Sequence, residues 1–74
     1  MRSEPVDVPE DTGLRWRMAL TQPIQVRSGY TGEKVGEWGP IATVCEFEWT
    51  GKTYSYGPGD NARIYVLRDI TKTL

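Results

Sequence analysis

The sequence contains no histidine and only one cysteine, Cys45, among its 74 residues. Histidine and cysteine are the usual ligands of structural zinc, so no zinc site is expected. A lone thiol cannot form an internal disulfide, and without histidine no Cys–His or Ser–His nucleophile pair can be built. These absences predict a cytoplasmic chain that has no metal, no cofactor and no enzymatic activity, with Cys45 serving as a small buried apolar side chain.

Long apolar runs are also missing. The longest covers only the four residues Ile64–Leu67, whereas a membrane-spanning helix needs about 20. A basic start followed by an apolar stretch, the pattern of a secretory signal, does not occur either. The sequence therefore predicts that the chain has no membrane partner.

Acidic and basic residues are distributed unevenly, although the formal net charge is only −1. Residues 1–13 carry one arginine against four acidic groups, while residues 14–74 hold eight basic and six acidic groups. Two prolines and only two valines, Val6 and Val8, accompany the acidic groups of the first segment. We therefore predict a disordered acidic arm over residues 1–13, free to fold back on the mildly basic remainder or to reach a partner.

Alternation of apolar and polar residues gives the clearest strand signals. Residues 14–20 alternate with period two, with Trp16 on the apolar face and Arg15 and Arg17 on the polar face. Ile24 and Val26 continue this pattern after Pro23. A further short strand is predicted at residues 34–38, and the β-branched and aromatic content of residues 63–67 predicts another.

A hairpin is predicted over residues 41–56. The alternating segment that ends at Trp49 is followed by Thr50-Gly51 and then by a second strand-like segment, residues 53–56. A two-residue turn would place Phe47 opposite Tyr54. A longer, bulged turn with Gly51 in the left-handed conformation is the alternative. Residues 57–61 predict a loop, and residues 69–72 either a single helical turn or a last short strand.

Five short strands with glycine-rich turns, within about 60 residues, predict one all-β domain over residues 14–74. Closure into a small barrel would remove exposed sheet edges. The order of elements resembles that of SH3-like barrels, and an OB-like barrel and a small β-sandwich are the alternatives.

Among polar residues, Glu46 and Glu48 share one strand face, and we expect them to lie across the sheet from Arg15 and Arg17 as exposed ion pairs.

The absence of a catalytic arrangement favours a non-catalytic adaptor or inhibitor that binds another protein. Loop aromatic residues and arginines are the side chains that most often dominate such interfaces. The predicted partner-binding residues are Tyr30, Trp38, Arg15, Arg17 and Arg63.

The alternative function is binding of single-stranded nucleic acid, with Arg15, Arg17 and Arg63 contacting phosphates and an aromatic side chain stacking on a base. The near-neutral charge weakens this alternative, because dedicated nucleic-acid binders are usually strongly basic. A homo-oligomer is compatible with either function.

Overall fold

The computed structural model describes residues 2–57 and 60–73 and shows one antiparallel sheet of six strands. The strands are β1 (Arg2–Asp7), β2 (Arg15–Ala19), β3 (Ile24–Arg27), β4 (Lys34–Trp38), β5 (Val44–Gly57) and β6 (Asp60–Asp69). A single 3-10 turn, η1 (Thr71–Thr73), follows β6. The all-β prediction is therefore confirmed. No helix in residues 2–57 and 60–73 has the length and apolar character needed to span a bilayer.

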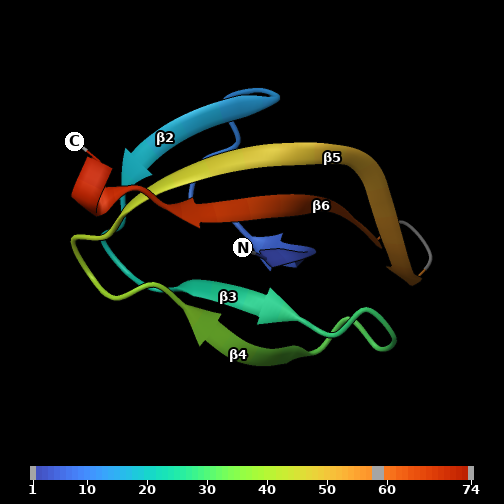
Figure 1. The fold of residues 1–74 in the computed structure, drawn as a ribbon. Coiled ribbons are helices and arrows are strands. Elements are labelled where there is room, and N and C mark those ends of the chain that lie inside the picture. Colours follow the sequence, from blue (N-terminus) through green and yellow to red (C-terminus); the bar gives the residue numbers. More distant parts are fainter. Residues whose placement is uncertain (1, 58–59, 74) are drawn as a thin grey trace.

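The predicted barrel is wrong, because the sheet does not close. The strand order is β2-β5-β6-β1-β3-β4, so β2 and β4 each pair on one side only (Figure 1). Closure, whether SH3-like or OB-like, would require these two strands to pair with each other. In residues 2–57 and 60–73 all six strands belong to one sheet that curls around its apolar face, which also removes the sandwich alternative.

The predicted disorder of the acidic arm, residues 1–13, is wrong for residues 2–7. Residues 2–7 form β1, which lies between β6 and β3 near the middle of the sheet (Figure 1). Val6 pairs with Val26 and is 5% exposed, so it belongs to the core. Two of the four acidic side chains that predicted disorder pair with basic groups of the remainder: Asp7 binds Arg27 and Lys34, and Asp11 binds Arg63. Five strands were expected and six are observed in the described residues, of which β1 was not expected.

The predicted hairpin around Thr50-Gly51 is wrong as well. β5 continues through this position and pairs with β6 along its length, so Phe47 lies opposite Leu67 rather than Tyr54. Gly51 does adopt the left-handed conformation, with φ of 87°, but it forms a bulge within the strand. The true β5–β6 hairpin reverses between Gly57 and Asp60, and residues 58–59 of the predicted loop lie outside the described residues.

The core lies on the inner face of the curled sheet. Trp16, on β2, stacks on Phe47 with ring centroids 4.8 Å apart and meets Tyr65 edge-on at 5.5 Å. The period-two alternation of residues 14–20 is thus confirmed, although Leu14 itself is exposed. Among the residues whose burial the structure describes, the buried apolar side chains are those of Val6, Leu20, Ile24, Val26, Cys45, Phe47, Tyr65 and Leu67.

Candidate binding surfaces

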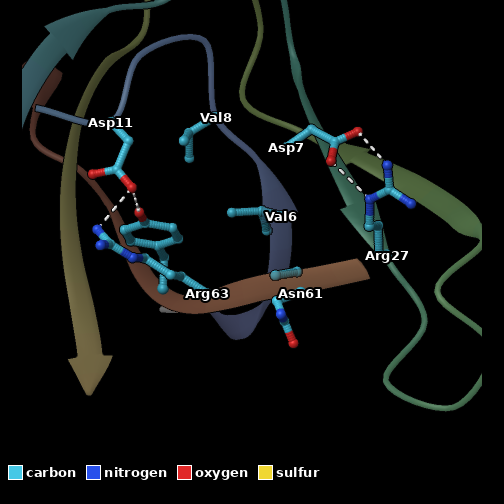
Figure 2. Close-up of a pocket in the computed structure, with 9 residues that line it drawn as sticks. Val6, Asp7, Val8, Asp11, Arg27, Asn61 and Arg63 are labelled. Carbon is cyan, nitrogen blue, oxygen red and sulfur yellow. Dashed lines mark hydrogen bonds and ion pairs between the residues drawn. The ribbon is translucent and has the colours of Figure 1, made fainter. Parts of the chain in front are cut away.

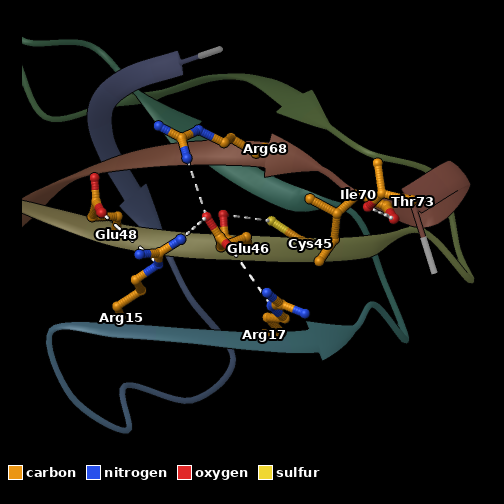
Figure 3. Close-up of polar contacts among 8 residues, drawn as sticks. All are labelled: Arg15, Arg17, Cys45, Glu46, Glu48, Arg68, Ile70 and Thr73. Atoms are coloured by element: carbon orange, nitrogen blue, oxygen red, sulfur yellow. Dashed lines mark hydrogen bonds and ion pairs between the residues drawn. The ribbon is translucent and has the colours of Figure 1, made fainter.

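Three arginines converge on one buried carboxylate on the outer face of β2, β5 and β6 (Figure 3). One Glu46 oxygen, Oε1, lies 3.2 Å from Arg15 Nη2 and 3.3 Å from Arg68 Nη1, and the other, Oε2, lies 3.4 Å from Arg17 Nε. The strand register explains the arrangement, because Glu46 pairs with Arg17 on one side and with Arg68 on the other. We call Arg15, Arg17, Glu46 and Arg68 the arginine cluster.

Burial of Glu46 distinguishes this cluster from ordinary surface ion pairs. Its side chain is 6% exposed, whereas those of Arg15 and Arg17 are each 59% exposed. The expected pairing across the sheet is confirmed, with Glu48 3.9 Å from Arg15, but Glu46 is not solvated as the sequence suggested. A buried carboxylate must keep its partners, so Glu46 holds three guanidinium groups in place while their outer edges face water.

Cys45 lies beside this cluster on β5 but points into the core. Its side chain is fully buried, as expected, and burial raises the pKa of the thiol to about 12. A thiol with this pKa stays protonated near neutral pH, and the thiolate is the nucleophilic form. Cys45 therefore acts as a packing residue.

A second feature is an open pocket of about 590 Å³ between β1, the segment that follows it, and β6 (Figure 2). Two ion pairs stand on its walls. Asp7 Oδ1 accepts a hydrogen bond from Arg27 Nε at 2.7 Å, and Asp11 Oδ2 accepts one from Arg63 Nη1 at 2.8 Å. The apolar part of the lining is formed by Val6, Val8, Ala62 and Tyr65.

The acidic side chains of the pocket engage their partners closely. The Tyr65 hydroxyl donates to Asp11 Oδ2 at 2.7 Å, and burial together with this hydrogen bond raises the pKa of Tyr65. Burial alone would raise the pKa of Asp7, but hydrogen bonds from Arg27 and Lys34 lower it overall. The acidic segment thus folds back on the remainder of the chain, and the carboxylates of Asp7 and Asp11 form ion pairs with the arginines of this pocket.

The β3–β4 loop presents an aromatic side chain that is almost fully exposed. Tyr30 is 95% exposed, yet the loop backbone is tied down: Ser28 N donates to Glu33 O at 2.8 Å, and Gly32 N donates to Ser28 O at 3.1 Å. Arg27 Nη1 also donates to Gly32 O at 2.7 Å. Trp38 differs, because it is half-buried at the end of β4 and packs against the core.

The five predicted partner-binding residues do not form one surface. Arg15 and Arg17 share the outer face of β2. Arg63 lies toward the inner face, with its guanidinium 4.5 Å from the Trp49 ring centroid. Tyr30 belongs to the β3–β4 hairpin, at the opposite margin of the sheet from β2. The described residues therefore give the nucleic-acid alternative no surface that unites these three arginines with a stacking aromatic residue.

Sequence reasoning did not place Arg68 beside Glu46, and it did not bring Asp11 and Tyr65 together. Arg68 could have been found only after β6 was paired with β5, which places it opposite Glu46. Asp11 was assigned to a disordered arm, and its contact with Tyr65 spans 54 positions of the chain. No local pattern indicates a contact over that separation.

No group of three or more potential metal-ligating side chains occurs in the part of the chain that the structure describes. A scan against protein-family models and searches of curated proteins and of solved structures found no match.

Proposed function

We propose that this chain is a non-catalytic protein-binding module, of adaptor or inhibitor type, that docks through the β3–β4 loop. The observation that carries the proposal is Tyr30, whose side chain is 95% exposed on a loop held by backbone hydrogen bonds. Tyrosine is among the residues that dominate protein interfaces. A large aromatic group exposed to this extent contributes little to packing of the sheet, so its burial becomes available to a partner.

The order of the loop supports the same function. Ser28 Oγ accepts hydrogen bonds from Tyr30 N at 3.1 Å and Thr31 N at 3.4 Å. A loop that is already ordered loses less conformational entropy when it binds, which leaves more of the contact energy for affinity. Val35, on the strand that leaves this loop, is 63% exposed and adds a second apolar side chain to the same hairpin.

The test compares immobilised wild type, Tyr30→Ala and Leu14→Ala as baits in extract from the source cells. Leu14 is the matched control, because it is another exposed large apolar residue, 66% exposed, and lies on the other side of the sheet. We expect quantitative mass spectrometry to find a protein retained by wild type and Leu14→Ala and at least about tenfold depleted on Tyr30→Ala.

Thermal melting of the same variants distinguishes binding from folding. Tyr30→Ala is expected to keep the wild-type Tm, whereas Trp38→Ala is expected to lower it because Trp38 packs against the core. A Tyr30→Ala variant that melts well below wild type, or a set of captured proteins that does not depend on Tyr30, would contradict the proposal.

A further inference from the structure

The outer side of β2 is an open sheet edge. The even-numbered positions that flank the strand bond toward β5: Trp49 N donates to Leu14 O, and Leu20 N donates to Thr43 O. In an antiparallel pair, alternate residues direct their N–H and C=O groups to opposite sides. The backbone groups of Arg15, Arg17 and Ala19 therefore face away from β5, where Figures 1 and 3 show no further strand beyond β2.

The side chains at this edge give it a charge pattern. Arg15 and Arg17 project from the outer face and are each 59% exposed, and Glu46 holds both of them in place. Trp16 and Met18 project from the inner face, where they are half-buried against the core. A strand added here would have alternate side chains beside the two arginines and the remaining ones beside the indole and the thioether.

β5 already shows which sequence suits this strand. Along the edge of β2 that is already paired, β5 places Glu48 opposite Arg15 and Glu46 opposite Arg17, with Phe47 opposite Trp16 between them. A strand with the order acidic, apolar, acidic therefore places carboxylates beside the arginines on the outer face of the sheet and an apolar side chain beside Trp16 on the inner face. The outer edge offers the same side chains to a second strand from the other direction.

A second copy of β2 is a poor occupant of this edge. Two antiparallel copies would place arginine opposite arginine on one face, because the outward-facing residues Arg15 and Arg17 would pair with each other, and like charges across a sheet are destabilising. The occupant must then carry the opposite charge.

We infer that the outer edge of β2 binds an extended acidic segment of another protein as an added strand. Its carboxylates, two residues apart, pair with Arg15 and Arg17, and an apolar residue between them lies beside Trp16. Backbone hydrogen bonds provide affinity in this mode, and the alternate side chains provide specificity. This surface is separate from the β3–β4 loop, so the inference stands or falls independently of Tyr30.

The probe is a synthetic peptide with the sequence of residues 44–50 carrying Cys45→Ser, acetylated and amidated at its ends. The control is an uncharged peptide that has the same sequence and also carries Glu46→Gln and Glu48→Gln. By NMR hydrogen exchange on the full chain, we expect the first peptide to slow exchange at the amides of Arg15, Arg17 and Ala19. The amides of Trp16 and Met18 are expected to stay protected, and the uncharged peptide to bind about tenfold more weakly.

Two variants of the chain separate charge from backbone pairing. Arg17→Gln should weaken binding of the acidic peptide, while Lys52→Gln, which removes an exposed lysine outside the arginine cluster, should not. Ala19→Pro removes one outward N–H without removing a bond to β5, since proline is tolerated at such edge positions. It should abolish protection while leaving the Tm near that of wild type.

Several outcomes would overturn the inference. One is unchanged hydrogen exchange at the amides of Arg15, Arg17 and Ala19, and another is equal binding of the charged and uncharged peptides. A third is loss of protection at the amides of Trp16 and Met18, because it would mean that the peptide replaces β5. Binding of a single-stranded oligothymidine at Arg15 and Arg17 in place of the peptide would also overturn it. Tyr30→Ala is expected to bind the peptide as wild type does.

Discussion

At the scale of single residues, Glu46 is the side chain on which the outer face of the sheet depends. It is nearly buried, and its two oxygens receive Arg15, Arg17 and Arg68. Removing one partner of a buried ion pair costs more than the pair contributes, because charges that were held together are left uncompensated. The same residue organises the two arginines that we assign to partner binding, so stability and binding share one carboxylate.

Glu46→Gln should lower the free energy of unfolding by about 2–3 kcal/mol, because three guanidinium groups lose their shared counter-charge. Glu48→Gln is the matched control. Its side chain is 41% exposed and 3.9 Å from Arg15, and such exposed pairs contribute about 1 kcal/mol or less. Urea denaturation followed by tryptophan fluorescence measures both values. Equal losses in the two variants would show that the burial of Glu46 carries no energetic weight.

Asp7 should make stability depend on pH. Burial alone would raise the pKa of its carboxyl, but hydrogen bonds from Arg27 and Lys34 bring it below the ordinary value of 3.8. A carboxyl whose pKa is lower in the folded chain stabilises the fold above the unfolded pKa and loses this effect as pH falls through the folded pKa. Wild type should exceed Asp7→Asn in unfolding free energy at pH 6.

This difference should shrink once the pH falls below about 4. Urea denaturation of both proteins between pH 6 and pH 3 provides the measurement. Should the gap between them stay constant over that range, the ion pairs of Asp7 would not be its source.

At the scale of elements, β5 is the strand that connects the curled core of the sheet with the extended β5–β6 hairpin. Its first half, with Cys45 and Phe47, pairs with both β2 and β6, and its second half pairs with β6 alone. The change occurs at the bulge around Gly51, where the register to β6 shifts between Trp49 and Thr53. A bulge increases local bending and twist, which lets one long strand serve both the curled core and the extended hairpin.

Gly51→Ala tests the bulge. A side chain at a φ of 87° is strained even though no heavy atom lies within 4 Å of the added Cβ, so we expect a loss of about 1 kcal/mol in unfolding free energy. Gly29→Ala is the control, because Gly29 has equally open surroundings and no positive φ. Chemical denaturation should place Gly29→Ala within about 0.5 kcal/mol of wild type. If both variants behave alike, the left-handed conformation at Gly51 is not required.

At the scale of the whole molecule, the open edges of the sheet must not pair with the edges of other copies of the chain. Within the described residues, β2 and β4 each pair with only one neighbouring strand. Exposed sheet edges promote aggregation unless charges or bulges protect them. β2 carries Arg15 and Arg17, while β4 carries Lys34 and Glu37 next to a register shift against β3. The charges that we assign to recognition of an acidic strand thus also oppose association of identical copies.

The double variant Arg15→Thr, Arg17→Thr should self-associate, because it replaces like charges with strand-forming neutral residues on an open edge. Analytical ultracentrifugation is expected to show a concentration-dependent oligomer for this variant. Arg15→Lys, Arg17→Lys keeps the charge and should sediment as wild type does. A folded threonine variant, with its cooperative melt retained, that sediments identically would show that these arginines do not protect the edge.

Local patterns in the sequence determined which segments form several strands and which side chains they bury. Alternation identified β2 and the inward direction of Trp16, β-branched content identified the centre of β6, and the spacing of Arg15 and Arg17 matched that of Glu46 and Glu48 on the neighbouring strand. These features follow from the two-residue repeat of a strand, which neighbouring residues express without help from the rest of the chain.

Only the tertiary structure decided where β1 lies, where β5 turns and whether the sheet closes. β1 is sparse in apolar residues and carries acidic ones, so its order depends on pairing with β6 and β3 and on the cations that Asp7 and Asp11 reach. The glycine at position 51 is compatible with a turn or a bulge, and the long pairing of β5 with β6 selects the bulge. Such contacts join residues far apart in the chain, and their energies do not appear in any short stretch of sequence.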